Sequence, residues 1–257
     1  WARVVSRRAV TGAAALGRRW GAGAGPRQAA RQGPAGWARC FGTEVLREGR
    51  FVPPSTLVAD KRTIGEADLI SNEEYLAIRT EAQRHRMQQR KVRRLLVGPY
   101  ASVTFECYDF LWTQIQEMLV IEGGGAEQVQ DELDAYRPLV PDGRSLVFTL
   151  MFEIDKKVLR EQVLARLEHV EHTLELRFPG AAGEHRIAAT NASGDTIDRS
   201  SDGRTSAVHF MRFRLDDTQA AYLKAAQEAS LAVTHEHYGH AVQLPAPLLG
   251  ELRGELA

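Results

Sequence analysis

The sequence predicts an α+β protein with a single mixed, mainly antiparallel sheet on which helices pack, preceded by a basic N-terminal helix. Segments with strand-like and helix-like patterns are intermixed over residues 66–250, and they lack the regular strand–helix–strand period of a parallel α/β protein. Turns such as Asp142-Gly143 and Pro179-Gly180 separate the strand segments. The segments 230–235 and 241–244 pair naturally as a hairpin.

The first helix of this region begins at a capping box, in which Ser71 and Glu74 satisfy each other's backbone amides. It is predicted to run for roughly twenty residues to about Arg94. Its C-terminal half is strongly basic, which suits the negative end of the helix macrodipole. The basic residues form either a solvated face or a surface for a phosphate-bearing partner. Nucleic acid is a disfavoured partner, because no aromatic or glycine-rich element interleaves with the charges.

The other elements follow in order after Gly98-Pro99, which breaks the chain. Apolar residues recur at helical spacing over 110–122, and glycines at 123–125 end that helix. Residues 146–154 form a nearly continuous apolar run, which indicates a central strand. Pro245 begins a short terminal helix. Further strands are predicted at 100–106, 173–178, 186–189 and 206–215, and further helices from the glycines to about residue 136, at 156–168 and at 216–228.

The first 43 residues differ in charge from the rest of the chain. They hold eight arginines and no lysine, aspartate or glutamate, whereas residues 44–257 hold 25 basic and 33 acidic residues. This composition predicts a disordered mitochondrial targeting presequence over 1–43, which the mitochondrial import machinery would deliver to the matrix. Arg39 and Phe41, followed by Gly42, resemble a site of the mitochondrial processing peptidase. A disordered tail or a nucleic-acid-binding arm is the alternative interpretation.

Residues 44–65 are predicted to form a poorly structured linker, because Pro53-Pro54 disfavours regular structure. No apolar run approaches the roughly 20 residues that span a bilayer, so no transmembrane segment is expected. Cys107 would be the only cysteine left after cleavage, and its strand-like context predicts a small buried hydrophobic residue. Phosphate loops, dinucleotide fingerprints, nucleophile elbows and HExxH zinc motifs are absent from the sequence.

Several blocks of sequence together resemble a known family. They are Phe-Glu at 105–106, Gln-Ile-Gln-Glu-Met-Leu at 114–119, Glu-Leu-Asp-Ala-Tyr at 132–136 with Leu139 and Pro-Asp-Gly at 141–143, Thr-Leu-Met-Phe-Glu at 149–153, Thr-Ser-Ala-Val-His-Phe at 205–210 with Arg-Phe at 212–213, and His235 with Tyr238. In this order and spacing, over about residues 66–245, they resemble the DUF3501 family of uncharacterised bacterial proteins. The resemblance implies no reaction. The position of family genes beside those for rubrerythrin-like proteins and iron–sulfur reductases implies a link to redox or oxidative-stress metabolism, with such proteins as partners.

Four polar residues lie where the pattern predicts a core: Glu106, Glu117, Glu153 and His209. An unpaired buried carboxylate is very unfavourable, so such groups usually find an arginine, a histidine or a metal ion. Three carboxylates and a histidine would suit iron or manganese. Alternatively, each is structural and pairs with Arg212, Arg214 or a backbone amide.

Two histidine-containing segments are further candidates. His235, His237 and His240 lie within six residues, but strand geometry puts only the first two on one face, so a turn with exposed histidines is the alternative to a metal clamp. Only His235 and Tyr238 of this segment match the family pattern, and with Arg212 they are the weaker site candidates. The stretch 168–172 contains a Glu-x-x-His spacing that superficially resembles a ferritin-like di-iron motif.

Two functions of different class remain. The first is a non-catalytic accessory factor of the mitochondrial matrix, linked to redox or iron metabolism, whose sheet and basic helix dock onto a partner. The second is a metal-dependent redox enzyme that uses iron or manganese. The enzyme requires the four polar core residues to converge in one pocket. The accessory factor requires them to be separately satisfied and an apolar or basic patch to be exposed.

Overall fold

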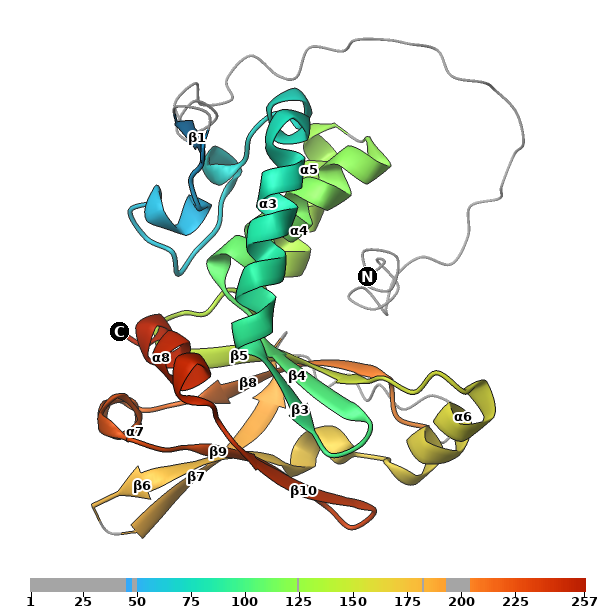
Figure 1. Cartoon of the computed structure of the whole chain (residues 1–257). Helices are drawn as coiled ribbons and strands as arrows, with labels where there is room; N and C mark the ends of the chain where they lie inside the picture. The colour runs from blue at the N-terminus through green and yellow to red at the C-terminus, as the bar shows by residue number, and fades with distance from the viewer. Residues whose placement is uncertain (1–44, 48–49, 124, 182, 193–203) are drawn as a thin grey trace.

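Eight strands form one sheet in the computed structural model, and every described pair of neighbouring strands is antiparallel (Figure 1). The structure describes residues 45–47, 50–123, 125–181, 183–192 and 204–257. The predicted α+β class with a mainly antiparallel sheet is therefore confirmed. None of the helices in these ranges combines the length and apolar character that crossing a membrane requires.

The elements have the following bounds. The strands are β1 (Leu46–Arg47), β2 (Arg50–Phe51), β3 (Arg94–Val97), β4 (Ala101–Phe105), β5 (Ser145–Phe152), β6 (Leu174–Gly180), β7 (Gly183–Asn191), β8 (Val208–Arg214), β9 (Ser230–His235) and β10 (Tyr238–Gln243). The α-helices are α3 (Asn72–Arg93), α4 (Tyr108–Glu122), α5 (Ala126–Tyr136), α6 (Lys157–Arg166), α7 (Asp217–Ala225) and α8 (Ala246–Glu255). Short 3₁₀ turns are η1 (Pro54–Thr56), η2 (Glu66–Asp68), η3 (Arg137–Leu139) and η4 (Val170–Thr173).

The sheet has the strand order β10-β9-β6-β7-β8-β5-β4-β3, and it curls until its two edge strands lie against each other. Tyr238 on β10 joins the edges. Its hydroxyl donates to the Val97 carbonyl (2.7 Å) and accepts from the Tyr100 and Ala101 amides (both 2.9 Å). Gly98, in the β3–β4 turn, has φ +68°, and a side chain there would collide with the ring of His240. Tyr238 thus links the two edge strands by hydrogen bonds, and His240 packs against the β3–β4 turn, so both residues lie at the seam between the edges.

Side chains of alternate residues divide the core into two clusters. On β5, residues 146, 148, 150 and 152 face the inside of the curled sheet, where α7 and α8 complete the inner cluster. Val147 faces the other way, into an outer cluster formed with α3, α4 and α5. These three helices stand together on the outer face of β4, β5 and β8 (Figure 1). The outer cluster covers only part of that face.

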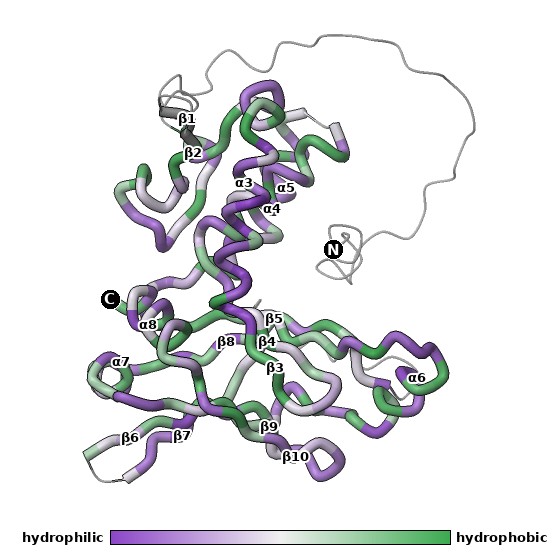
Figure 2. Tube along the Cα trace, viewed as in Figure 1, coloured by the Kyte–Doolittle hydropathy of each residue, from purple (hydrophilic) through white to green (hydrophobic). Residues whose placement is uncertain are grey.

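Helix α3 begins as its sequence predicts and ends differently. The capping box is present: Glu74 N donates to Ser71 Oγ (3.2 Å), and Ser71 N donates to Glu74 Oε2 (2.9 Å). Figure 2 shows α3 as predominantly hydrophilic. The helix nevertheless packs on α4 and α8. Its last residue leads directly into β3, an edge strand of four residues that was not predicted from the sequence.

The segment that was expected to be a poorly structured linker packs onto the helices where it is described. Val45 and Ile64 are fully buried in the outer cluster. Ser55, in η1, donates from both its amide and its hydroxyl to Asp109 of α4, at 2.8 and 3.0 Å. The predicted presequence and its cleavage residues Arg39, Phe41 and Gly42 lie outside the described residues.

Candidate functional site

The basic residues of α3 meet the carboxylates that the sequence places in the core. Glu117 on α4 receives four hydrogen bonds from three residues of α3. Tyr75 Oη donates at 2.7 Å, Arg79 donates from Nε and Nη2 at 2.9 and 2.8 Å, and Gln83 Nε2 donates at 2.9 Å. Burial alone would favour the neutral acid, but the hydrogen bonds from Arg79, Tyr75 and Gln83 outweigh it and lower the pKa of Glu117. Glu117 is therefore an ionised link between two helices.

Glu106 has a different environment, between β4 and α4. Thr149 donates a 2.6 Å hydrogen bond to Glu106 Oε1. Burial raises the pKa of Glu106, and the Thr149 hydrogen bond and the positive charges of Arg86 and Arg93 oppose that rise only in part. The adjoining cavity, which Gln114 also lines, has a volume of about 20 Å³. A space of this size holds about one water molecule.

Glu153 lies at the open end of the same outer face. It accepts hydrogen bonds from Arg94 (2.6 Å) and from Ser102 Oγ (2.7 Å), and its side chain is half-exposed. His209 lies elsewhere, on β8 opposite Leu150. Its Nε2 is 2.8 Å from the Ser206 carbonyl oxygen and 3.1 Å from Thr205 Oγ1.

The four predicted site residues therefore have four separate sets of partners. No described group of three or more metal-ligating side chains with closely spaced ligand atoms includes any of them. Within the described part of the chain they do not come together in the shared iron or manganese site, which was one of the two interpretations of the sequence. The structural interpretation expected Arg212 or Arg214 as partners, whereas the arginines that bind Glu117 and Glu153 come from α3 and β3. Arg212 instead donates to the carbonyls of Pro138 (2.8 Å) and Ala192.

Among the described residues, the His235 imidazole makes its hydrogen bonds with backbone atoms. Its Nε2 lies 3.1 Å from the Glu168 carbonyl, and its Nδ1 accepts from the His237 amide at 3.2 Å. With both ring nitrogens occupied, His235 does not join His237 in a metal clamp, and His240 packs edge-on against Tyr238 at the seam. Cys107 is buried, as predicted, and burial raises the pKa of its thiol to about 12, which makes a reactive thiolate unfavourable.

Asp109 is a polar junction that the sequence did not reveal. Besides Ser55, it meets two residues of α3. His85 Nε2 lies 3.2 Å from Oδ2, and Gln89 Nε2 donates to the same oxygen at 3.2 Å. Burial favours the neutral acid, but the hydrogen bonds from His85 and Ser55 prevail and lower the pKa of Asp109. Asp109 thus ties the N-terminal segment to α3 and α4.

An open groove of about 1020 Å³ lies on the uncovered part of the outer face, between the C-terminal half of α3, β3 and α6. Met87 of α3 and Leu96 of β3 line it, and their exposed fractions are 61 % and 62 %. Both side chains have apolar surface that is available to a partner. Val158, at the start of α6, is also exposed, although it does not line the groove.

The charged residues of the groove are predominantly basic. Its four basic residues are Arg90, Lys91, Arg94 and Arg160, and its two acidic residues are Glu153 and Asp155. The ion pair between Arg94 and Glu153 neutralises one charge of each sign. Burial lowers the pKa of Arg90, and the positive charges of Arg94 and Arg86 lower it further. The groove is therefore a positively charged, partly apolar surface.

Comparisons with known proteins agree with the resemblance found in the sequence. The family model described as "Protein of unknown function (DUF3501)" matches residues 63–256. The crystal structure of a novel protein of unknown function from Burkholderia pseudomallei K96243 is similar, with a TM-score of 0.69 and 34 % sequence identity. The alignment covers 76 % of this chain and 100 % of that chain. No curated protein matches the chain.

Proposed function

The chain belongs to the DUF3501 family, whose function is unknown, and we propose that it is a non-catalytic accessory protein that binds a partner protein in the groove between α3 and the outer face of the sheet. The observation that carries this proposal is the pair of exposed apolar side chains, Met87 and Leu96, inside a groove with an excess of basic residues. Methionine suits such a surface, because its flexible side chain adapts to the shape of a partner.

The occupant that fits this groove is an amphipathic helix with an acidic face. Helix-in-groove recognition uses apolar anchors that repeat along one helix face. Met87 and Leu96 would contact those anchors, while Lys91 and Arg160 would lie opposite acidic side chains at the edges of the helix. Charge complementarity favours this occupant over a basic one.

A nucleic-acid partner is less favoured, because several basic residues of α3 have intramolecular partners. Arg79 binds Glu117, Arg93 binds Glu251 and Glu255, and Arg94 binds Glu153. A surface for a phosphate backbone would present these cations to solvent. The separate pairing of the polar core residues likewise supports an accessory role over the metal-dependent redox enzyme.

The proposed location is the mitochondrial matrix, and it rests on the arginine-rich composition of residues 1–43. A fluorescent reporter fused behind these residues should enter mitochondria and be shortened near Gly42. An Arg39→Ala variant should be imported but cut poorly at that position. A reporter that stays in the cytosol would contradict this location. The gene neighbourhood attributed to the family makes rubrerythrin-like and iron–sulfur proteins the first partners to test.

The docking proposal is tested by replacing Leu96 with a photo-crosslinking amino acid in cells and identifying the crosslinked peptide. Ile121 of α4 is the matched control position, because it is equally apolar and 56 % exposed but does not line the groove. The expected result is one predominant acidic, helical segment captured from position 96 and not from position 121. Lys91→Glu should reduce that product. Equal capture from both positions would contradict the proposal, and capture of a second copy of this chain would show self-association instead.

A further inference from the structure

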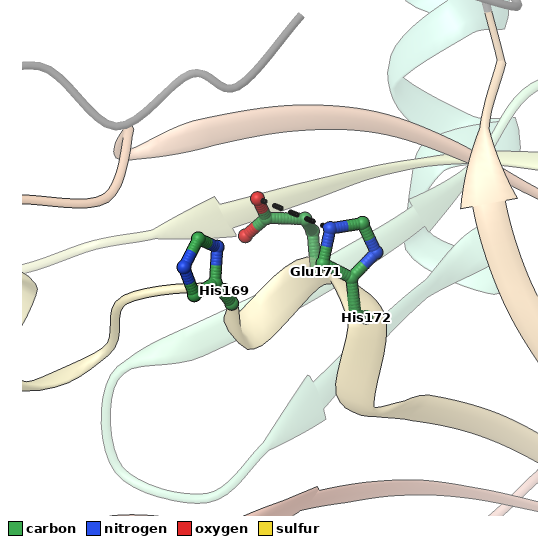
Figure 3. Close-up of side chains that lie close together, drawn as sticks. All are labelled: His169, Glu171 and His172. Carbon is green, nitrogen blue, oxygen red and sulfur yellow. Dashed lines mark ion pairs between the residues drawn. The ribbon is translucent and has the colours of Figure 1, made fainter. Parts of the chain in front are cut away.

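The 3₁₀ turn η4 brings two histidines to the same side of the chain. His172 lies within this turn and His169 is the residue before it, and their imidazoles lie on either side of the Glu171 carboxylate (Figure 3). His169 precedes the turn with φ +61°, the only positive φ of a non-glycine residue among those described. Positive φ is uncommon for residues other than glycine, and here it directs the imidazole towards the side of the turn where His172 lies.

Glu171 completes a group of three with these histidines (Figure 3). One ligand atom from each of the three side chains lies within 4.8 Å of the others. The Nε2 atom of His172 is 4.0 Å from Glu171 Oε1. In a tetrahedral zinc site with bonds of about 2.0–2.1 Å, neighbouring ligand atoms lie roughly 3.4 Å apart. The imidazoles of His169 and His172 are 58 % and 72 % exposed, so they are free to rotate the remaining distance.

The Glu171 carboxylate is an independent sign that a ligand belongs here. Its side chain is only 10 % exposed, and its Oε2 atom has no hydrogen-bond partner among the described residues. The Nδ1 atom of His209, at 3.9 Å, is beyond hydrogen-bond distance. A buried carboxylate oxygen without a hydrogen bond is costly, and a cation bound beside it removes that cost. Figure 3 shows this carboxylate between the two imidazoles.

The last residues of β9 contact the chain on both sides of the η4 turn. On the N-terminal side, His235 Nε2 lies 3.1 Å from the Glu168 carbonyl. On the C-terminal side, Thr234 Oγ1 donates to the Thr173 carbonyl at 3.1 Å. A ligand group on a fixed turn loses less entropy when it binds a metal. His235, a candidate ligand from the sequence, is in this arrangement a positioning residue.

We propose that His169, Glu171 and His172 bind a divalent transition-metal ion, and that Zn²⁺ is the ion they fit best. Two imidazoles and one carboxylate match the ligand set of zinc sites that keep a coordination position open. Magnesium and calcium prefer sites made of oxygen ligands, so two imidazoles disfavour them. The three residues do not line the groove, so zinc binding can be confirmed or excluded independently of the proposed docking function.

The test uses the full chain without a polyhistidine tag, stripped of metal with a chelator and titrated with zinc against a chromophoric zinc indicator. The wild type is expected to bind one zinc ion per chain and to melt at a higher temperature with zinc. His172→Ala and His169→Asn should each weaken zinc binding at least tenfold. Asparagine is used at position 169 because it tolerates positive φ. Glu171→Gln, which keeps the side-chain volume, should also weaken binding at least tenfold.

His237→Ala is the matched control, because His237 is also an exposed histidine beside a glutamate. This variant should bind zinc as the wild type does. Cobalt should give the absorption bands of a four- or five-coordinate ion in the wild type and the control, but not in His172→Ala. Zinc binding that survives in the double variant His169→Asn/His172→Ala would be adventitious and would overturn the proposal. A wild type that retains less than one zinc ion per chain in the titration would overturn it too.

Discussion

Replacing Glu117 with glutamine tests whether the basic helix serves the fold. Glu117 accepts four hydrogen bonds, three of them from the cationic Arg79 or the buried Tyr75. Glutamine keeps one acceptor oxygen and turns an NH₂ group towards an arginine donor. A hydrogen bond to a charged group contributes about 1.5–3 kcal/mol. Because Arg79 is 39 % exposed and can bind water instead, we expect Glu117→Gln to lower the free energy of unfolding by about 2 kcal/mol.

Glu153→Gln is the matched control for this measurement. Glu153 also accepts from an arginine, but both partners are partly exposed, so its replacement should change the free energy of unfolding by less than about 1 kcal/mol. The assay is urea unfolding followed by circular dichroism at several pH values. Equal destabilisation by Glu117→Gln and Glu153→Gln at neutral pH would show that the hydrogen bonds of Glu117 do not stabilise the fold as expected.

The pH dependence of the same variant gives a second check. The pKa of Glu117 is lower in the folded protein than in the unfolded chain. Its contribution is therefore complete above the unfolded pKa of about 4.3 and is lost as the pH falls through the folded pKa. The difference in unfolding free energy between wild type and Glu117→Gln should shrink over that acidic range. A difference that stays constant as the pH falls would contradict the assignment of an ionised Glu117.

Three other substitutions test the remaining structural claims. Burial raises the pKa of Glu106, so the folded protein favours the neutral acid. The stability that this neutral acid contributes is complete below the unfolded pKa and is lost as the pH rises through the folded pKa. Glu106→Gln should therefore lower the free energy of unfolding by less than about 1 kcal/mol at pH 7. Unfolding titrations at several pH values should also show that this free energy falls less with rising pH in the variant than in the wild type. Tyr238→Phe leaves two backbone amides at the seam without their acceptor and should cost about 2–3 kcal/mol in urea unfolding, whereas an unchanged midpoint would exclude a seam role. Gly98→Ala should lower the melting temperature, and adding His240→Ala should restore part of the loss by removing the collision.

Local signals in the sequence identified most of the fold. The capping box of Ser71 and Glu74 marked the start of α3, and the αL glycine at 123 ends α4 as a C-cap glycine does. The β9–β10 hairpin was predicted, but β10 begins at Tyr238, three residues before the predicted strand, and Gly239 pairs within it. These signals act within a few residues, so they can be read without tertiary context. Strand β3 was missed because its four residues continue a helical pattern and are strand-like only through pairing with β4.

The partners of the polar residues could not be predicted, because they are set by contacts distant in sequence. The hydrogen bond between Arg79 and Glu117 joins positions 38 residues apart, and that between Arg94 and Glu153 joins positions 59 apart. The sequence correctly required partners for the carboxylates, but it could not show that α3 supplies them. The histidines at 169 and 172 looked like an incidental part of a charged helix, and only the 3₁₀ turn places them with Glu171.

Binding of an acidic helical segment in the groove can be measured as an affinity. The segment crosslinked at position 96 would be synthesised and titrated into the full chain, into Leu96→Asp and into the control Ile121→Asp. We expect Leu96→Asp to weaken binding at least tenfold, because it replaces an apolar contact with a negative charge opposite an acidic helix. Ile121→Asp should bind as the wild type does, since Ile121 lies outside the groove. Equal affinities for the wild type and Leu96→Asp would show that the segment does not bind in the groove.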